Sequence, residues 1–354
     1  MIVKRLFLSV TLVLAGLLLA SCGGSSPAWP DTKDGTRILG VDFGKKVPSL
    51  IAFSRMFETT NGPTRDLFVM FPDGTHEKRL TNNIADDDYP AFSPNGFALA
   101  FVSNRPGPGW GNHDVYRLDS PGKISQLTSY NWEFDSSATD WAPGYITAAQ
   151  HNTLIMAPFD VIRLQTISPI GKWEQTVQTG FIANYDPCVS RDGKMVAFCA
   201  RPNCPGEDDP GCMGTLQLFL LKKGETTPVQ LTDFGGDPLD PILIRHPAFD
   251  FAQTRIVFQT TYWGDNWDIG YIRLGDGTAP ELYRLTDDPA DDVEPCFDPS
   301  GLWIAFATNR DGNFEIYKTW DPYNPLGMPA PAEPTVRLTY TAQDEANPDW
   351  SPLY

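Results

Sequence analysis

Short apolar runs separated by polar turns recur from about residue 50 to the end of the chain. Each run holds about four to seven apolar, β-branched or aromatic residues and is bounded by Gly, Pro, Asn or Asp. This pattern is typical of β-strands joined by tight turns. The composition agrees, because 12% of the residues are aromatic and the chain has 30 Gly and 32 Pro. An all-β protein is therefore predicted.

The runs belong to a repeat marked by a Leu-Thr pair. Successive pairs lie 47, 104, 54 and 53 residues apart, and the longest interval equals two periods of 52. One copy is thus hidden, and WEQTVQ at 173–178 lies near its expected position, which gives six repeats. The leucines of the readable pairs are Leu80, Leu127, Leu231, Leu285 and Leu338.

Each repeat contains four predicted strands, which we name A to D. They are represented by EPCFDPSG (294–301) for A, WIAFATNR (303–310) for B, EIYKT (315–319) for C and TVRLT (335–339) for D. Six such units predict a six-bladed β-propeller of four-stranded antiparallel blades. The first recognisable strand, at 50–54, is a B strand, and the last, at 347–352, is an A strand. We therefore expect the C-terminal strand to close the ring, which would hide both edges.

The repeat resembles the TolB-type propeller repeat. The best copy is EPCFDPSGLWIAFATNRDGNFEIYKT at 294–319; five of the six copies are readable, and the similarity covers roughly residues 47–354. The resemblance implies a propeller over residues 37–354 and a protein-binding role in the cell envelope. TolB proteins carry an α/β domain before the propeller, whereas here only a short tether is expected there.

The N-terminus has the pattern of a bacterial lipoprotein signal. Lys4 and Arg5 precede a 15-residue apolar run at 6–20, which is short for a membrane span. The following Leu-Ala-Ser-Cys resembles a lipobox, so residues 1–21 are predicted to be removed and Cys22 to be lipidated; an ordinary signal peptide is the alternative. Residues 22–36 would form the lipidated tether, and Gly23 after the cysteine favours the outer membrane.

Charge narrows the choice of partners. The chain has 27 Lys and Arg against 44 Asp and Glu, a net charge of −17, which argues against nucleic acid. The D–A loops are rich in acid and should share one face near the channel, where they would attract a basic partner or a cation such as calcium. The candidate binding residues are Asp87, Asp88, Asp291, Asp292, Asp344 and Glu345. The alternative is structural: such carboxylates would cap amides or pair with Arg105, Arg201 or Arg310.

Four cysteines are candidates for disulfides, because the expected compartment is oxidising. Cys204 and Cys212 bracket an insertion, Cys188 and Cys199 lie across one hairpin, and Cys296 is left over. No metal-ligand or nucleophile motif is present, so no cofactor and no catalytic residue is predicted. The predicted function is a non-catalytic envelope scaffold that touches the membrane through its anchor only. The competing hypothesis is a propeller enzyme such as a metal-assisted polysaccharide lyase.

Overall fold

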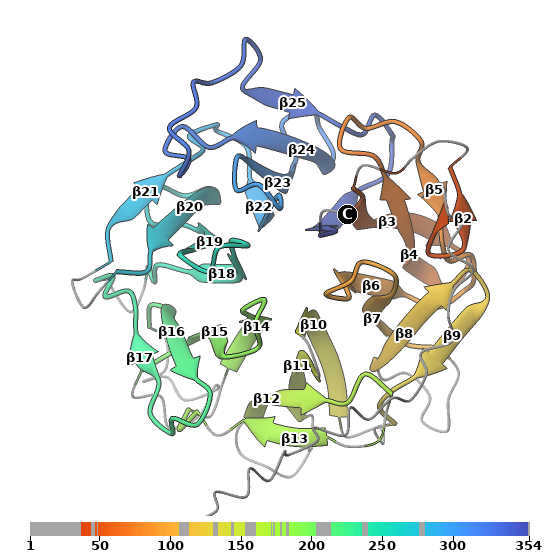
Figure 1. The fold of residues 1–354 in the computed structure, drawn as a ribbon, viewed down its shortest axis with the longest axis horizontal. Helices are drawn as coiled ribbons and strands as arrows, with labels where there is room; N and C mark the ends of the chain where they lie inside the picture. Colours follow the sequence, from red (N-terminus) through yellow and green to blue (C-terminus); the bar gives the residue numbers. More distant parts are fainter. Residues whose placement is uncertain are drawn as a thin grey trace, which may run out of the picture.

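Six four-stranded antiparallel sheets surround a central channel in the computed structural model (Figure 1). The structure describes residues 37–352, apart from gaps at 44–46, 48, 106–112, 130–133, 143–144, 153–160, 171, 173, 178, 182–183, 203–213, 236–239 and 276–279. The predicted all-β, six-bladed propeller is confirmed. The predicted signal peptide, Cys22 and tether lie outside the described residues.

Each blade reads from its innermost strand A to its outermost strand D. Blade 1 contains β26 (Glu345–Trp350), β3 (Ile51–Thr59), β4 (Gly62–Met70) and β5 (Lys78–Arg79). Blade 2 contains β6 (Asp87–Phe92), β7 (Leu99–Ser103), β8 (Asp114–Ser120) and β9 (Lys123–Gln126). Blade 3 contains β10 (Phe134–Ala142), β11 (Tyr145–Asn152), β12 (Val161–Ile167) and β13 (Glu174–Val177).

The other three blades repeat this arrangement. Blade 4 contains β14 (Asn184–Val189), β15 (Met195–Ala200), β16 (Gln217–Lys222) and β17 (Val229–Gln230). Blade 5 contains β18 (Ile244–Phe249), β19 (Arg255–Thr260), β20 (Asp268–Arg273) and β21 (Leu282–Arg284). Blade 6 contains β22 (Asp292–Phe297), β23 (Trp303–Thr308), β24 (Glu315–Trp320) and β25 (Thr335–Arg337).

The ring is closed by the strand that the sequence predicted. β26 pairs antiparallel with β3, in a register that places Glu345 opposite Arg55 and Trp350 opposite Ile51. Beyond the strand, the amide of Leu50 donates to the Ser351 hydroxyl at 2.7 Å, and the Ser351 amide donates to the Leu50 carbonyl at 2.8 Å. Blade 1 is thus assembled from both ends of the described chain.

The repeated Leu-Thr pair has a structural role. After strand D, the threonine hydroxyl accepts the amide of a strand C residue: Leu67 donates to Thr81 at 2.9 Å, and Ile316 donates to Thr339 at 2.8 Å. Thr128, Thr232 and Thr286 do the same. The hydroxyl therefore extends the pairing of C and D beyond the short D strand, which explains why the pair recurs.

A phenylalanine of strand B lies at the centre of five of the six blades. Its side chain is fully buried in five blades, at Phe53, Phe101, Phe198, Phe258 and Phe306. In four of these it lies beside an aromatic ring of strand C, as for Phe53 and Phe68, whose centroids are 5.6 Å apart. Burial of these rings stabilises the blades through apolar contacts.

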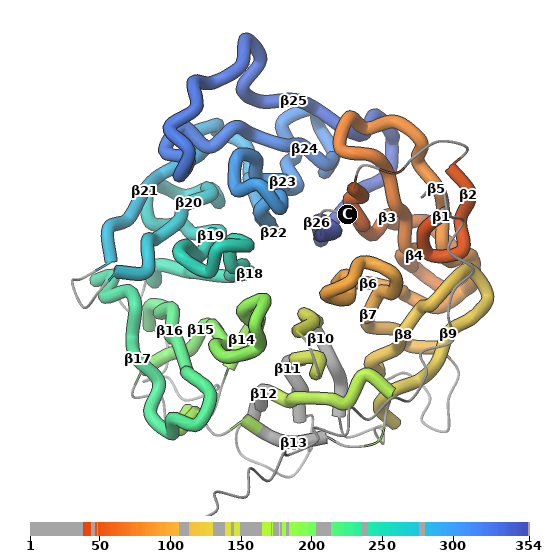
Figure 2. The backbone as a smooth tube through the Cα atoms, viewed as in Figure 1, coloured from red at the N-terminus to blue at the C-terminus, as the bar shows by residue number. Residues whose placement is uncertain are grey.

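A small hairpin precedes blade 1. β1 (Arg37–Ile38) pairs with β2 (Val41–Asp42), and the turn residues Leu39 and Gly40 both have positive φ. A Cβ on Gly40 would lie 2.5 Å from that of Ser120, so the turn packs closely on the β8–β9 connection. Figure 2 shows the hairpin beside β4 and β5. In the part of the chain that the structure describes, no helix has the length and apolar character needed to cross a bilayer.

The predicted disulfide between Cys188 and Cys199 is wrong. Both thiols are buried and free. The bulge between Tyr185 and Cys188 shifts the register, so Cys188 lies opposite Ala197 while Cys199 lies opposite Tyr185. Cys296 is also free and buried, as expected. Cys204 and Cys212 lie outside the described residues.

Candidate functional site

The innermost strands of all six blades line a central cavity of about 190 Å³. Its walls are the A strands from the level of the prolines down to the A–B turns, where Pro94, Arg191, Phe251 and Pro352 contribute. In an antiparallel meander the A–B and C–D turns emerge on one face and the B–C and D–A loops on the other. The cavity therefore reaches the A–B/C–D face.

A ring of unlike polar residues lies at the other end of the cavity. In five blades the residue before the strand A proline has positive φ, between 45° and 55°, and each such position coincides with a bulge in the pairing of A and B. A positive φ costs a non-glycine residue about 1–2 kcal/mol. These five residues, which we call the proline ring, are Tyr89, Asp186, His246, Glu294 and Asn347.

Neighbouring blades hold the proline ring in place. Asp186 accepts the His246 amide at 3.0 Å, and Glu294 accepts the Asn347 amide at 2.5 Å. Asp186 also pairs with Arg245 at 2.5 Å. Burial alone would raise the pKa of Asp186. The charges of His246 and Arg245 have the larger combined effect, so the pKa of Asp186 is lowered. These bonds satisfy amides that the bulges leave unpaired.

Two members of the proline ring meet across the channel. Tyr89 of blade 2 and His246 of blade 5 belong to opposite blades, yet their ring centroids are 6.2 Å apart and nearly parallel, at 8°. The pair narrows the channel at this level. The cavity is therefore a cup whose narrow end points toward the B–C/D–A face.

Two carboxylates without a cationic partner line the middle of the cup. Asp140 accepts the Val189 amide of the next blade at 2.7 Å, and Asp349 accepts the Phe92 amide at 2.6 Å. Among the described residues neither forms an ion pair. Burial raises the pKa of Asp140 to about 6; burial, together with the charge of Asp140, raises that of Asp349 to about 7.

These raised pKa values predict a protein that is more stable in mild acid. Between the unfolded value of about 4 and the folded values, the native state binds more protons, so unfolding becomes easier as pH rises. Glu345, with its pKa raised to about 7 by burial and by Glu315, acts in the same direction. We expect a higher melting temperature at pH 5.5 than at pH 8, with a total contribution on the order of a few kcal/mol.

Thermal unfolding at the two pH values measures this effect directly. Asp349→Asn keeps the oxygen that accepts the Phe92 amide but removes the titratable carboxyl group. It should therefore reduce the difference in melting temperature between pH 5.5 and pH 8. Glu225→Gln, an exposed carboxylate in a C–D turn, should leave the difference unchanged. An equal or higher melting temperature at pH 8 for the unaltered protein would contradict the prediction.

The structure buries four of the six carboxylates predicted to form the binding face. Asp87, Asp292 and Glu345 are fully buried and pair with Arg105, Arg310 and Arg55, respectively. They do not line the cavity, so the expectation that they surround the channel mouth is corrected. Each of the three pairs with an arginine in strand B of its own blade or just after it, and such pairing is the structural alternative recognised in the sequence. Asp88 is buried as well, and it accepts the Ser54 hydroxyl and the Asn347 amide group.

The remaining two candidates also make structural bonds. Asp291 accepts the Trp267 amide at 3.0 Å, and Asp344 accepts the Phe314 amide at 2.8 Å. Both are half-buried, and each ties a D–A loop to strand C of the preceding blade. Asp86, the equivalent residue of blade 2, accepts the Arg65 amide in the same way. Most of the acid that marks this face in the sequence therefore holds blades together.

Exposed acid and exposed aromatic rings coincide elsewhere on the B–C/D–A face, over blades 4 and 5. The D–A loop residue Phe234 contacts Tyr262 of a B–C loop, with centroids 4.5 Å apart, and Tyr262 is 44% exposed. Trp263 lies against Tyr262 and under the Arg284 guanidinium. We call this region the aromatic–acidic patch, and it consists of Asp233, Phe234, Tyr262, Trp263, Asp265 and Asp287.

The three carboxylates of the patch are exposed, and none forms an ion pair with a described residue. The sequence predicted acid in the D–A loops, which contain Asp233 and Asp287, but these two residues were not singled out. The signal that would have found it is the run TYWGDNW at 261–267, which brings three aromatic residues into the B–C loop of blade 5. An aromatic cluster rimmed by unpaired charge is typical of a protein interface.

No metal centre emerges from the part of the chain that the structure describes, where no three His, Cys, Asp or Glu side chains are arranged to hold an ion. His76 lies in a C–D loop and stacks on Phe71, while His113 lies within 3.4 Å of Asp86 in a B–C loop. These two histidines are on opposite faces. Of the histidine side chains that the structure describes, only His246 lines the cavity.

Comparison with solved structures relates this architecture to known propellers. TolB from Acinetobacter baumannii superposes with a TM-score of 0.65 at 16% identity, over 86% of this chain and 67% of that one. The chain has the TolB-type propeller fold. A putative TolB from Agrobacterium tumefaciens also matches, with a TM-score of 0.52 at 15% identity, over 82% of this chain and 89% of that one. The fold implied by the repeat is thereby confirmed.

The same TolB-type propeller fold occurs within an enzyme. Hydrazine synthase from Kuenenia stuttgartiensis has a TM-score of 0.64 at 13% identity, over 86% of this chain. The match spans 47% of the hydrazine synthase chain, so it covers about half of that protein. No family model and no curated protein matches the sequence. At these identities the likeness concerns the fold alone.

Proposed function

We propose that this TolB-type propeller is a non-catalytic protein-binding module of the bacterial cell envelope, held at the membrane by acyl chains on Cys22. The aromatic–acidic patch is the observation that carries the binding role. Tyr262 and Phe234 offer rigid apolar area, and Asp233, Asp265 and Asp287 surround it with negative charge. This combination suits a partner with a basic rim around an apolar centre.

The anchor is supported by the sequence, in which Leu-Ala-Ser-Cys follows a short apolar run. Gly23 after the cysteine favours the outer membrane. Several acyl chains on one residue would hold the protein stably, at about 0.8 kcal/mol for each buried methylene. The fold likeness to the two TolB structures supports an envelope role by analogy only.

Binding is tested with the partner that the protein captures from envelope extract, purified for affinity measurement. Tyr262→Ala should weaken that binding by about 2 kcal/mol, roughly thirtyfold, because it removes a central aromatic contact. Joint replacement of Asp233, Asp265 and Asp287 by Asn should slow association and reduce its salt dependence.

The matched control is Glu225→Gln, which removes an exposed carboxylate from the opposite face. It should bind like the unaltered protein. Equal affinity of the control, the Tyr262 variant and the triple Asn variant at low and high salt would assign the interaction to another surface.

A further inference from the structure

The A–B/C–D face carries exposed lysines as well as exposed carboxylates, whereas the opposite face carries the acid of the aromatic–acidic patch. Every lysine of the described residues lies at an A–B or C–D turn or beside one. Lys318 is half-buried and donates to the Pro72 carbonyl at 2.7 Å, and the others are exposed. The exposed lysines are Lys78, Lys123, Lys172, Lys194, Lys222 and Lys223. Among the described residues, the exposed ammonium groups therefore lie on one side of a chain whose net charge is −17.

The same face carries an exposed apolar loop. The C–D connection of blade 6, residues 321–334, stands out from the ring at the top of Figure 1. Its stretch 322–332 reads PYNPLGMPAPA and contains no charged residue. Leu326 is 64% exposed and Met328 is 46% exposed, whereas such side chains are usually buried. Tyr323 is also exposed, and the Arg273 guanidinium donates to its carbonyl.

The loop is held in a defined shape. The Asn324 side chain accepts the Met328 amide at 2.9 Å and donates to the Met328 carbonyl at 2.9 Å, which closes a small ring around Gly327. At its base, buried Asp321 pairs with Arg255 of blade 5. These hydrogen bonds and this ion pair hold the loop in a shape that exposes Leu326 at its tip.

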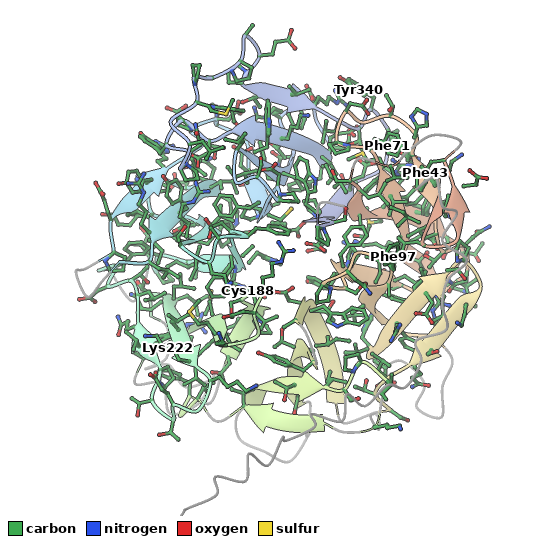
Figure 3. All side chains as sticks on the ribbon, in the orientation of Figure 1. Phe43, Phe71, Phe97, Cys188, Lys222 and Tyr340 are labelled. Carbon is green, nitrogen blue, oxygen red and sulfur yellow. The ribbon has the colours of Figure 1, made fainter. Side chains whose placement is uncertain are left out.

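The chain also enters the propeller on this face. The β1–β2 hairpin packs on the β8–β9 turn through Gly40, and Phe43 stacks on Phe71 of the β4–β5 turn, with centroids 5.3 Å apart (Figure 3). Both turns are C–D turns. A lipid-attached residue 22 would therefore draw this face, with its lysines and the apolar loop, toward the bilayer.

We propose that the A–B/C–D face lies against an anionic bilayer and that Leu326 and Met328 insert into its interfacial region. The proposal rests on the proposed lipid anchor for its orientation. It departs from the expectation that only the anchor touches the membrane. Apolar tips suit the acyl boundary, Tyr323 suits the headgroup level, and lysines attract anionic lipid. The aromatic–acidic patch then faces away from the membrane, toward its protein partner.

The test uses the full mature protein on vesicles of phosphatidylcholine and phosphatidylglycerol that carry a lipid-bound nitroxide quencher. An environment-sensitive dye is attached at Leu326→Cys and, as the matched control, at Ile84→Cys. Ile84 is 75% exposed on the opposite face. The protein without an added cysteine gives the background. We expect a blue shift and quenching at position 326, neither at position 84, and a smaller effect without phosphatidylglycerol.

The outcomes separate this proposal from the anchor. If the protein floats with the vesicles while the dye at 326 stays in water, membrane docking of this face is wrong and the anchor stands. If the mass of the N-terminal peptide shows an unmodified Cys22, the anchor is wrong. The dye at 326 on the unanchored protein then decides docking by itself, since quenching supports it and its absence overturns it. If the dye at position 326 shifts to the blue only when an envelope protein is added, membrane docking is also wrong, and this face binds a protein partner instead.

Discussion

Deleting residues 346–354 should lower the melting temperature of the whole domain by roughly 10 °C or more, although it removes only nine residues. The deletion takes away most of β26, and with it the pairing to β3 and the bonds between Leu50 and Ser351. It also removes buried Trp350, whose loss alone costs about 3–5 kcal/mol. Arg55 remains, but its place beside Glu345 depends on a strand that no longer exists.

Thermal unfolding of purified protein measures this effect. Deletion of residues 353–354 alone is the matched control, because those residues lie outside the described strand, and it should change little. Trp350→Ala should give an intermediate loss. A truncated protein that melts at the temperature of the full chain would show that β26 does not stabilise the ring.

Replacing Arg255 by Met should be the most damaging single charge substitution among the described residues. Arg255 is buried, and it contacts Asp250 at 3.1 Å, Asp321 and the Gly301 carbonyl, all at the junction of blades 5 and 6. Its loss would leave two buried carboxylates without a cation, at about 3–5 kcal/mol. The same change would loosen the loop that carries Leu326.

A compensated variant distinguishes lost charge balance from lost packing. If unpaired charge causes the damage, Arg255→Met combined with Asp250→Asn and Asp321→Asn should recover part of the stability in denaturant unfolding. Lys194→Gln, which breaks an exposed pair with Asp192, should cost at most about 1 kcal/mol. If the Lys194 and Arg255 variants lost similar amounts of unfolding free energy, this account would be wrong.

The sequence predicted the architecture well because the repeat encodes its own hydrogen bonds. The threonine of each Leu-Thr pair bonds strand C, and a phenylalanine of strand B is buried in five of the six blades, so both recur visibly. The same repetition predicted ring closure through the unmatched strands at the two ends. An acidic residue also opens strand C in four blades, and all four are buried: Asp66, Asp114, Asp268 and Glu315. The β1–β2 hairpin was missed because its strands have only two residues each.

The individual binding residues could not be predicted in the same way. A difference of one position decides whether a carboxylate such as Asp86 caps an amide at the surface or, like Asp87, is buried against Arg105. Loop composition does not contain that information. The bulge before Cys188 shifted the register and misled the disulfide prediction for the same reason. Contact between Tyr89 and His246 depends on ring geometry and leaves no local signal.

Closure of blade 1 by β26 has a consequence for how the molecule is made. The Leu50–Ser351 contact joins residues 301 positions apart, so the first blade to be synthesised is the last to be completed. Until the ribosome has translated β26, strand β3 presents an unpaired edge that can recruit a strand from another chain. Folding must wait for this distant contact, and the wait slows it. A chain that ends before β26 therefore keeps the edge of β3 open to other strands.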